Sequence, residues 1–340
     1  MCRVRLLTSA ATALLALAFC LAGCSSVPAP SLQRYEFSSP HMGTLFHLTL
    51  YAPDPAAART AADAAFHRVA ALEEIMSDYQ ADSELMRLCD QPYGRPVHVS
   101  AELFEILQRA REFSELSRGA FDVTVGPYVR LWRFSRKRQK LPAAAELQSA
   151  RQSVGFDKIR LDPRARTVTL LASNMRLDLG GIAKGYAADQ VLALLQGRGL
   201  TRALIAASGD IAIGDPPPDQ SGWKIGIAPM DARTNETVQT VWLRNAGIST
   251  SGDSAQMIEL EGVRYSHIVN PATGLGLTNR VQVTVIARDA TTTDALATAI
   301  SILGPGEGLA LVEKLPRTAA IVFTEGGHQR KPAVSRRWPR

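Results

Sequence analysis

The feature that most constrains how this chain folds is an apolar run near its N-terminus, from Leu6 to Ala22, which contains no charged residue. Arg3 and Arg5 precede the run, and basic residues followed by a short apolar stretch are typical of an export signal. An exported chain loses such a signal, so the folded part must be built from the residues that follow it. We therefore expect a soluble domain outside the cytoplasm.

The run ends in "LAGC", Leu21 to Cys24, which resembles the lipobox of bacterial lipoproteins. The resemblance implies cleavage before Cys24 and acylation of its thiol, with residues 1–23 as the signal and 24–34 as a lipidated tether. The lipid would anchor the protein to the bacterial cell membrane, facing the periplasm or the cell exterior. A transmembrane anchor is the alternative, because the run is nearly as long as the roughly 20 residues that span a bilayer.

The cysteines decide how the folded part is stabilised. Removal of the signal and acylation of Cys24 leave Cys89 as the free thiol of a chain with 4 cysteines. An intrachain disulfide is then excluded, so stability must come from a hydrophobic core, for which roughly 300 residues suffice. Cys89 lies in "LMRLCDQPYG", where we expect a helix to end. A half-buried structural cysteine is favoured there over a catalytic thiol.

The formal charge of +6 is unevenly distributed and argues against a nucleic-acid partner. Arg3 and Arg5 leave with the predicted signal, and a tail from His328 to Arg340 carries five further basic residues and no acidic one. The body between these ends is therefore near −1, which does not supply the broad basic surface that nucleic-acid binding needs. We expect the tail, 328–340, to be disordered and to contact anionic lipid weakly.

Hydrophobic periodicity predicts an alternation of helices and short strands. The expected helices cover residues 55–76, 101–119, 143–153, 182–196, 291–303 and 306–314. The expected strands cover residues 44–52, 167–172, 203–206, 224–228, 238–243, 281–287 and 319–324. The basic segment "RFSRKRQKLP" is interpreted as a connector between helices. This mixture indicates an α+β fold with mixed, largely antiparallel sheets and packed helices.

Three segments rich in glycine interrupt this pattern. They are "DLGGIAKGYAAD" (Asp178 to Asp189), "AASGDIAIG" (Ala206 to Gly214) and "ISTSGD" (Ile248 to Asp253). Each is compatible with an ordinary turn that needs glycine. The first also fits a phosphate site, because glycines let a ligand approach the free N–H groups at a helix N-terminus. Its spacing is neither GxGxxG nor that of a P-loop, which excludes Rossmann and Walker assignments.

Two further segments carry polar side chains on otherwise apolar elements. In "TTTDALATAISILG", Asp294 and Thr298 are four residues apart, so a carboxylate and a hydroxyl share one face of a helix. They are either a cap and a back-bonding hydroxyl, or ligands for a hard cation. His267, in "YSHIVNPATGLG", is either a structural side chain or a general base. The residues alone leave both alternatives open.

Taken in order, eight segments resemble the ApbE family of flavin transferases, which are FAD:protein FMN transferases. They are "HMGTLFHL", "MSDYQADSEL", "GAFDVTVGPYVRLWRF", "DLGGIAKGYAAD", "SGDIAIG", "ISTSGD", "HIVNPATG" and "TDALATA", and together they run from about residue 42 to residue 298. The resemblance implies an ApbE-like, T-fold-related domain over residues 35–327, with FAD as substrate and Mg²⁺ as cofactor. It also implies transfer of FMN from FAD to a Ser or Thr hydroxyl of a target flavoprotein, with release of AMP. The implied acceptors are subunits of membrane redox complexes.

The resemblance also assigns roles to residues of the metal and the reaction. The side chains of Asp294 and Thr298, together with the main-chain carbonyl of Ala183, match the metal ligands of the family. His267 matches a base that takes the proton of the acceptor hydroxyl. Lys184 would stabilise phosphate charge, or it is a solvated lysine early in a helix.

Further matches concern the two halves of the FAD molecule. Met42 and Tyr79 match positions that line the flavin, although Tyr79 in a hydrophobic slot is also compatible with a core residue. The positions around the nucleotide are matched by Ala120, Phe121, Asp122 and Asp178.

Two departures from the family pattern and two alternative functions remain. Ser208 stands where the family often has a first glycine, and Asn270 stands where Asp is common. Serine is small enough to keep the turn, and asparagine keeps an oxygen. One alternative function is hydrolysis of FAD to FMN and AMP. The other is a lipoprotein that binds FAD without catalysis, which would not require His267.

Overall fold

The computed structural model describes residues 31–228, 230, 239–252, 257–260, 262–325 and 332–339. The chain divides into two units, Met1–Ser31 and Leu32–Arg340, and the second unit contains all the elements of the fold. The predicted signal, Cys24 and most of the predicted tether lie outside the described residues. The first strand begins at Gln33, so the last residues of the predicted tether already belong to the folded unit.

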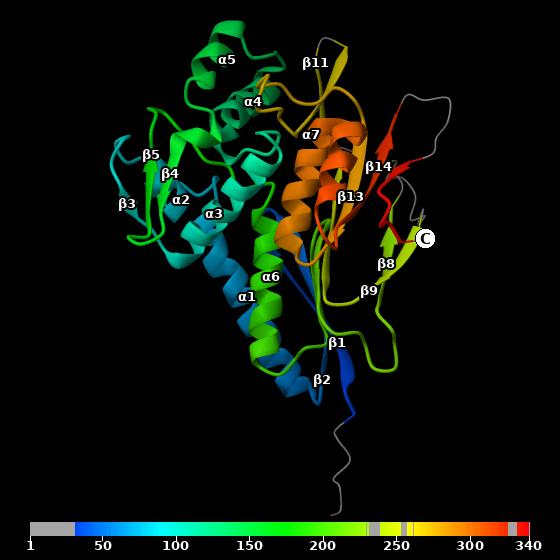
Figure 1. The fold of residues 1–340 in the computed structure, drawn as a ribbon. Coiled ribbons are helices and arrows are strands. Elements are labelled where there is room, and N and C mark those ends of the chain that lie inside the picture. Colours follow the sequence, from blue (N-terminus) through cyan, green and yellow to red (C-terminus); the bar gives the residue numbers. More distant parts are fainter. Residues whose placement is uncertain are drawn as a thin grey trace, which may run out of the picture. The chain divides into compact units, whose positions relative to one another are not determined.

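An eight-stranded sheet forms the centre of this unit (Figure 1). Its strand order is β1 (Gln33–His41), β2 (Thr44–Ala52), β6 (Ala203–Ala207), β7 (Asp210–Ile213), β10 (Ala246–Gly252), β13 (Val281–Ala287), β14 (Ala319–Thr324) and β15 (Ala333–Val334). Each pairing between these described strands is antiparallel. Every residue of β13 is buried, so both faces of the sheet are covered along this strand.

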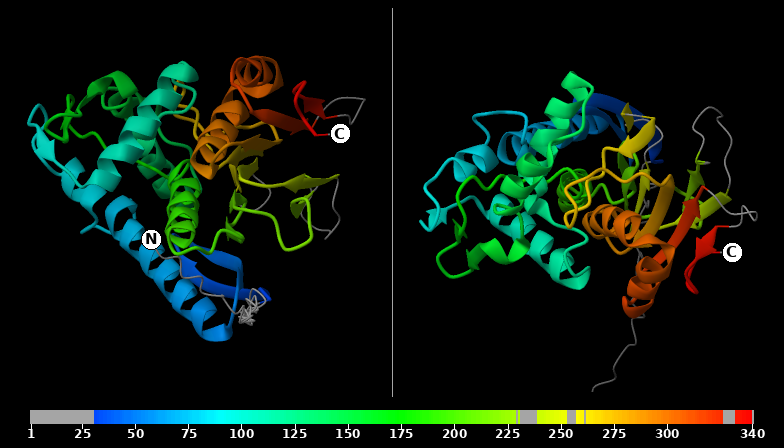
Figure 2. Two further views of the ribbon diagram at one scale, coloured as in Figure 1. Left: turned by 60° about the horizontal axis from the view of Figure 1, so that its bottom comes forward. Right: turned by 90° about the horizontal axis from the view of Figure 1, so that it is seen from above.

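Three helices cover one face of the sheet. They are α1 (Pro55–Met76), α6 (Ala183–Gly197) and α7 (Ala290–Lys314), and Figures 1 and 2 show them side by side. α1 contacts β1 and β2, α6 contacts β6 and β7, and α7 contacts β10 and β13. Because α6 lies between the other two helices, its small residues Ala187 and Ala188 are fully buried.

The hairpin of β8 (Trp223–Ile227) and β9 (Gln239–Leu243) covers the opposite face. Its Trp223 joins a hydrophobic cluster with Ile286, whereas the neighbouring Val285 belongs to the main core beneath the helices. Residues that alternate in this way along a strand point to opposite faces. Trp338 completes the hairpin cluster.

The C-terminal tail is ordered over residues 332–339, which corrects the expected disorder there. β15 pairs with β14, and Trp338 is only 7% exposed. The Trp338 indole N–H donates a hydrogen bond to the side chain of Gln239. Burial of the Trp338 ring thus stabilises this segment, which its basic residues alone had indicated to be solvated. The remaining tail residues lie outside the described residues.

A group of smaller elements adjoins the helical layer (Figure 1). It consists of α2 (Glu84–Cys89), α3 (Ala101–Leu116), α4 (Gly126–Arg138), α5 (Ala144–Arg151), β3 (Val97–His98), β4 (Ile159–Asp162), β5 (Thr167–Leu170), β11 (Met257–Leu260), β12 (Val263–Ser266) and the 3-10 turns Val123–Val125 and Phe156–Lys158. Ser100 caps α3 by accepting a hydrogen bond from Leu103 N–H, as predicted. Cys89 ends α2 as predicted, but it is 8% exposed rather than half-buried, and burial raises the pKa of its thiol.

Two sequence expectations about local structure are corrected, and a third is confirmed. The segment taken as a basic connector is mostly the second half of α4, and Gln139 caps the end of this helix in the left-handed conformation. Two of the glycine-containing segments taken as turns contribute the strands β7 and β10. The two helices expected after residue 290 are confirmed as the two parts of α7, which meet at a kink where Gly304 is not helical and Pro305 follows. α7 is also long and apolar enough to cross a membrane, but it packs on the sheet as a core helix.

Candidate active site

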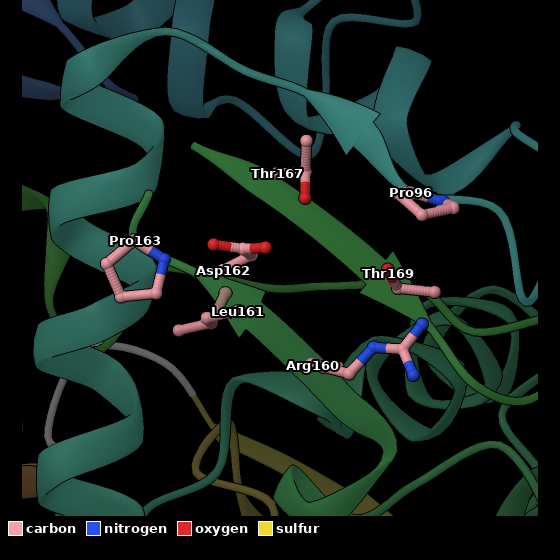
Figure 3. A pocket seen from close by; sticks show the side chains of 7 residues that line it. All are labelled: Pro96, Arg160, Leu161, Asp162, Pro163, Thr167 and Thr169. Atoms are coloured by element: carbon pink, nitrogen blue, oxygen red, sulfur yellow. The ribbon is translucent and has the colours of Figure 1, made fainter. Parts of the chain in front are cut away.

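One cavity of about 670 Å³ collects every site residue expected from the sequence. Its lining includes Met42, Tyr79, Ala120, Phe121, Asp122, Asp178, Ala183, Lys184, His267, Asp294 and Thr298. A second, smaller hollow of about 320 Å³ lies over β4 and β5 and contains none of them (Figure 3). The larger cavity is therefore the candidate active site.

The inner end of this cavity lies where α6 crosses α7. The crossing is close because Gly185 has no side chain: a Cβ there would lie 2.2 Å from the Ala290 carbonyl oxygen. At the same point Gly185 N–H, in the first turn of α6, donates to Asp294 Oδ2 at 3.0 Å. A buried carboxylate thus accepts one of the free N–H groups of a helix start, which is a favourable place for negative charge.

Lys184 connects two buried carboxylates at this inner end. Its Nζ lies 2.8 Å from Asp210 Oδ2 and 3.8 Å from Asp294 Oδ2. Burial acts to lower the pKa of Lys184, but the two carboxylates outweigh it and raise that pKa. Burial and the neighbouring Asp210 raise the pKa of Asp294 to about 7. Lys184 is therefore an ion-paired residue rather than a solvated one.

The donors at this end are hard oxygens with an excess of negative charge. Two carboxylates share one ammonium group, and their repulsion contributes to the raised pKa of Asp294, so a bound cation would stabilise both carboxylates in the ionised form. Thr298 lies one turn after Asp294, and its hydroxyl oxygen is 3.0 Å from where a Cβ of Gly181 would be. Ala183 is the first residue of α6. Among the described residues no three His, Cys, Asp or Glu side chains form a metal-binding group, so a metal here would need the hydroxyl and carbonyl ligands.

The outer rim of the cavity is built around Tyr79 and Arg133. Tyr79 is 81% exposed, which excludes the alternative that it is a core residue. The Arg133 guanidinium carbon lies 4.0 Å from the centre of the Tyr79 ring, as in a cation–π contact. Arg133 also pairs with Asp78 and lies 4.0 Å from Asp178 Oδ2. On the same side Met42 has a left-handed φ of 49°, and its N–H donates to Glu73.

The predicted nucleotide residues lie between the two ends. Asp178 Oδ1 accepts a hydrogen bond from Gly180 N–H, while burial and the Asp78 carboxylate raise the pKa of Asp178 to about 6. Asp122 Oδ1 accepts from the N–H and hydroxyl of Thr124, so it caps a 3-10 turn as well as lining the cavity. Burial raises the pKa of Asp122. Ala120 and Phe121 are buried beside it.

His267 follows β12 on a loop that α4 holds in place. Trp132 of α4 donates its indole N–H to the Gly274 carbonyl at 2.8 Å, and its ring lies 5.2 Å from that of Tyr265. His267 itself is exposed and lines the cavity. Asn270 Oδ1 accepts from Ala272 N–H, so the amide keeps the turn that an aspartate would make.

Sequence reasoning missed three residues of the site. Arg133 and Trp132 lie within "GAFDVTVGPYVRLWRF", and Asp210 lies within "SGDIAIG". The apolar positions of the first segment follow a helical period, and that period would have placed both side chains on one helix face. Asp210 had no such signal, because its importance depends on a contact with Lys184, 26 residues earlier in the chain.

The comparisons with known proteins agree over most of the chain. The model of the ApbE family matches residues 42–323. A FAD:protein FMN transferase of Vibrio cholerae is 31% identical over 313 residues, which are 90% of this chain and 92% of that protein. The FAD:protein FMN transferase of Treponema pallidum is 32% identical over 305 residues, with 85% and 84% covered. A solved structure of the flavin transferase ApbE from Vibrio cholerae has a TM-score of 0.79 at 29% identity, covering 90% of this chain and 98% of that one.

Proposed function

Because this chain belongs to the ApbE family, we propose that it transfers the FMN moiety of FAD to a Ser or Thr hydroxyl of a target flavoprotein and releases AMP. The relatives named as FAD:protein FMN transferases support the flavin-transfer part of this proposal. The observation that carries the rest is a single cavity with His267 in its lining and the pair Asp294 and Thr298 at its inner end.

Mg²⁺ fits the inner end of the cavity. Asp294, Thr298 and the Ala183 carbonyl would hold it, because Mg²⁺ prefers a few hard oxygen ligands and keeps room for waters and phosphates. When bound, it would neutralise negative charge on the pyrophosphate of FAD. The excess of carboxylate over ammonium charge around Lys184 supports a cation at this place.

The remaining steps are carried by the protein's own side chains. His267 would accept the proton of the acceptor hydroxyl as its oxygen attacks the phosphorus on the FMN side. The bond from that phosphorus to the bridging oxygen breaks, and AMP leaves with the oxygen. Lys184 would offset phosphate charge while it remains paired with Asp210. Tyr79 and Met42 at the rim would contact the flavin, and Asp178 and Asp122 the nucleotide.

The acceptor and the cellular location complete the proposal. An export signal and acylation at Cys24 would hold the enzyme at the bacterial cell membrane, on the periplasmic or outer side. Flavoprotein subunits of membrane redox complexes that face this compartment are the expected acceptors. The body of the chain has a net charge near −1, which does not favour nucleic acid as a partner.

An intact-mass experiment separates this function from its alternatives. The chain is incubated with FAD, Mg²⁺ and a flavoprotein subunit that faces the periplasm. Addition of FMN to the subunit supports transfer, whereas free FMN and AMP alone would mean hydrolysis. If FAD remained unchanged, the chain would be an FAD-binding protein that does not catalyse either reaction. His267→Ala and Asp294→Ala should each abolish the mass increase, and undiminished transfer by either variant would refute the role given to that residue.

A further inference from the structure

The strongest concentration of positive charge among the described residues lies on α4 and just after it. Between Asp122 and Glu146 the sequence contains six basic residues and no acidic one: Arg130, Arg133, Arg136, Lys137, Arg138 and Lys140. The rest of the body is correspondingly acidic, because the body as a whole is near −1. The charge of this helix is therefore a local feature and not a consequence of overall composition.

Two neighbouring stripes divide the surface of α4. Val129, Trp132, Arg133 and Arg136 recur at helical spacing and line the active-site cavity. Arg130, Phe134, Lys137 and Arg138 form the adjacent stripe, which is exposed. We call this second stripe the α4 basic face. Since Arg133 borders both stripes, the basic face begins at the rim of the cavity.

The fold leaves the charges of the α4 basic face without ion-pair partners among the described residues. None of Arg130, Lys137 and Arg138 forms an ion pair within the described part of the chain. Phe134 is 43% exposed, with the guanidinium carbons of Arg130 and Arg138 at 6.0 and 5.8 Å from its ring centre. A helix dipole favours basic residues in the last turn, which accounts for Lys137 and Arg138 but not for Arg130.

We propose that the α4 basic face docks an acidic segment of the protein that receives the flavin. This inference rests on transfer to a protein acceptor, the function proposed above. An exposed aromatic residue between arginines is a typical centre of a protein interface, and unpaired arginines bind carboxylates in bidentate geometry. Docking beside the rim would bring a nearby Ser or Thr of the acceptor to the mouth of the cavity.

A membrane surface would also attract this charge, but the position of α4 favours a protein. One stripe of α4 lines the cavity and the basic face adjoins that stripe, so anything docked on the basic face lies beside the cavity. An anionic bilayer in that position would obstruct the acceptor. An acidic protein segment would instead be part of the substrate that must enter.

The test measures binding without flavin chemistry, so that its result does not depend on whether transfer occurs. The protein is the chain from Leu32, which forms one compact unit. The probes are two labelled peptides of the same length with one central Thr, one flanked by Asp and Glu and the other by Asn and Gln. Fluorescence anisotropy gives the dissociation constants at low salt and at about 0.15 M salt.

Two triple variants isolate the surface. R130Q/K137Q/R138Q removes the charge of the α4 basic face, and R160Q/R164Q/R166Q removes the same charge from exposed positions around β4 and β5. We expect the unchanged chain and the second variant to bind the acidic peptide about tenfold more tightly than the neutral one at low salt, and the first variant to lose this preference. Thermal unfolding checks that both variants fold.

Three results would overturn the proposal. The first is that the unchanged chain binds both peptides equally well. The second is that the R130Q/K137Q/R138Q variant still prefers the acidic peptide. The third is that the unchanged chain binds phosphatidylglycerol vesicles, the R130Q/K137Q/R138Q variant does not, and neither protein prefers the acidic peptide. That result would make the α4 basic face a lipid-binding surface. A negative result here leaves the FMN-transfer experiment unaffected, since that experiment reads the mass of the acceptor.

Discussion

The two ends of the cavity are built in different ways. At the inner end, backbone atoms and buried charges meet at the crossing of α6 and α7, with Gly185 N–H on Asp294 and Lys184 on Asp210. At the outer rim, the exposed ring of Tyr79 lies against Arg133. Contacts of the first kind have no freedom to relax, whereas those of the second kind are screened by water. Substitutions should therefore threaten the fold at the inner end and tune ligand affinity at the rim.

The largest effect is expected at the helix crossing. In Gly185→Ala the new Cβ would lie 2.2 Å from the Ala290 carbonyl oxygen and 2.9 Å from Asp294 Cβ, so α6 and α7 must separate. We expect a loss of about 3 kcal/mol in the free energy of unfolding, measured by urea denaturation, together with loss of FMN transfer. Gly197→Ala is the matched control in the same helix, because nothing lies within 4 Å of its added Cβ. Equal losses in both variants would contradict the role of the crossing.

The next largest effect is a pH dependence of stability that Asp178, between the two ends of the cavity, should cause. Burial and Asp78 raise the pKa of Asp178 to about 6, above its value in the unfolded chain. Because this pKa is higher in the folded chain, the protonated carboxyl stabilises the folded state. The stabilisation by Asp178 is therefore present at low pH and is lost as the pH rises through about 6. Relative to Asp178→Asn, the wild-type chain should lose about 2 kcal/mol of unfolding free energy between pH 4 and pH 7. Urea titrations at both pH values measure it, and a constant difference would contradict the shift.

Sequence reasoning predicted the elements of the inner end better than those of the rim. Asp294, Thr298 and Ala183 lie on helices that the apolar residues predicted, and the family resemblance supplied their expected roles. The helix bounds 55–76 and the strand bounds 44–52 and 281–287 were predicted as the structure has them. The rim depends on Arg133 of a helix that was taken for a connector, because a run of basic residues hid its apolar period. The C-terminal strand was missed for a similar reason, since its order comes from Trp338 packing on a distant hairpin.

A smaller effect is expected from Arg133 at the rim. Arg133→Gln removes the cation over Tyr79 and leaves Asp78 and Asp178 without their shared partner. We expect FAD to bind about tenfold more weakly, a change of about 1.4 kcal/mol in binding free energy. Without the guanidinium, the Tyr79 ring and the two carboxylates no longer have a common partner that fixes their positions. Flavin fluorescence quenching measures the dissociation constant. Arg130→Gln, one turn away and outside the cavity lining, should leave FAD affinity unchanged; a similar loss there would mean a general effect of charge.

The smallest effect is expected in the turn between β6 and β7, where a substitution should raise stability rather than lower it. Ser208 adopts a left-handed φ of 58°, which strains any residue with a side chain, whereas the adjacent Gly209 is required because a Cβ would lie 2.5 Å from the Thr250 carbonyl oxygen. Ser208→Gly relieves that strain but adds freedom to the unfolded chain, so we expect a net gain of about 0.5 kcal/mol in unfolding free energy. Gly209→Ala should destabilise the same turn. Urea denaturation of Ser208→Gly and Gly209→Ala measures both changes. A loss of stability in Ser208→Gly would contradict the prediction, because it would mean that contacts of the Ser208 side chain outweigh the strain of its backbone.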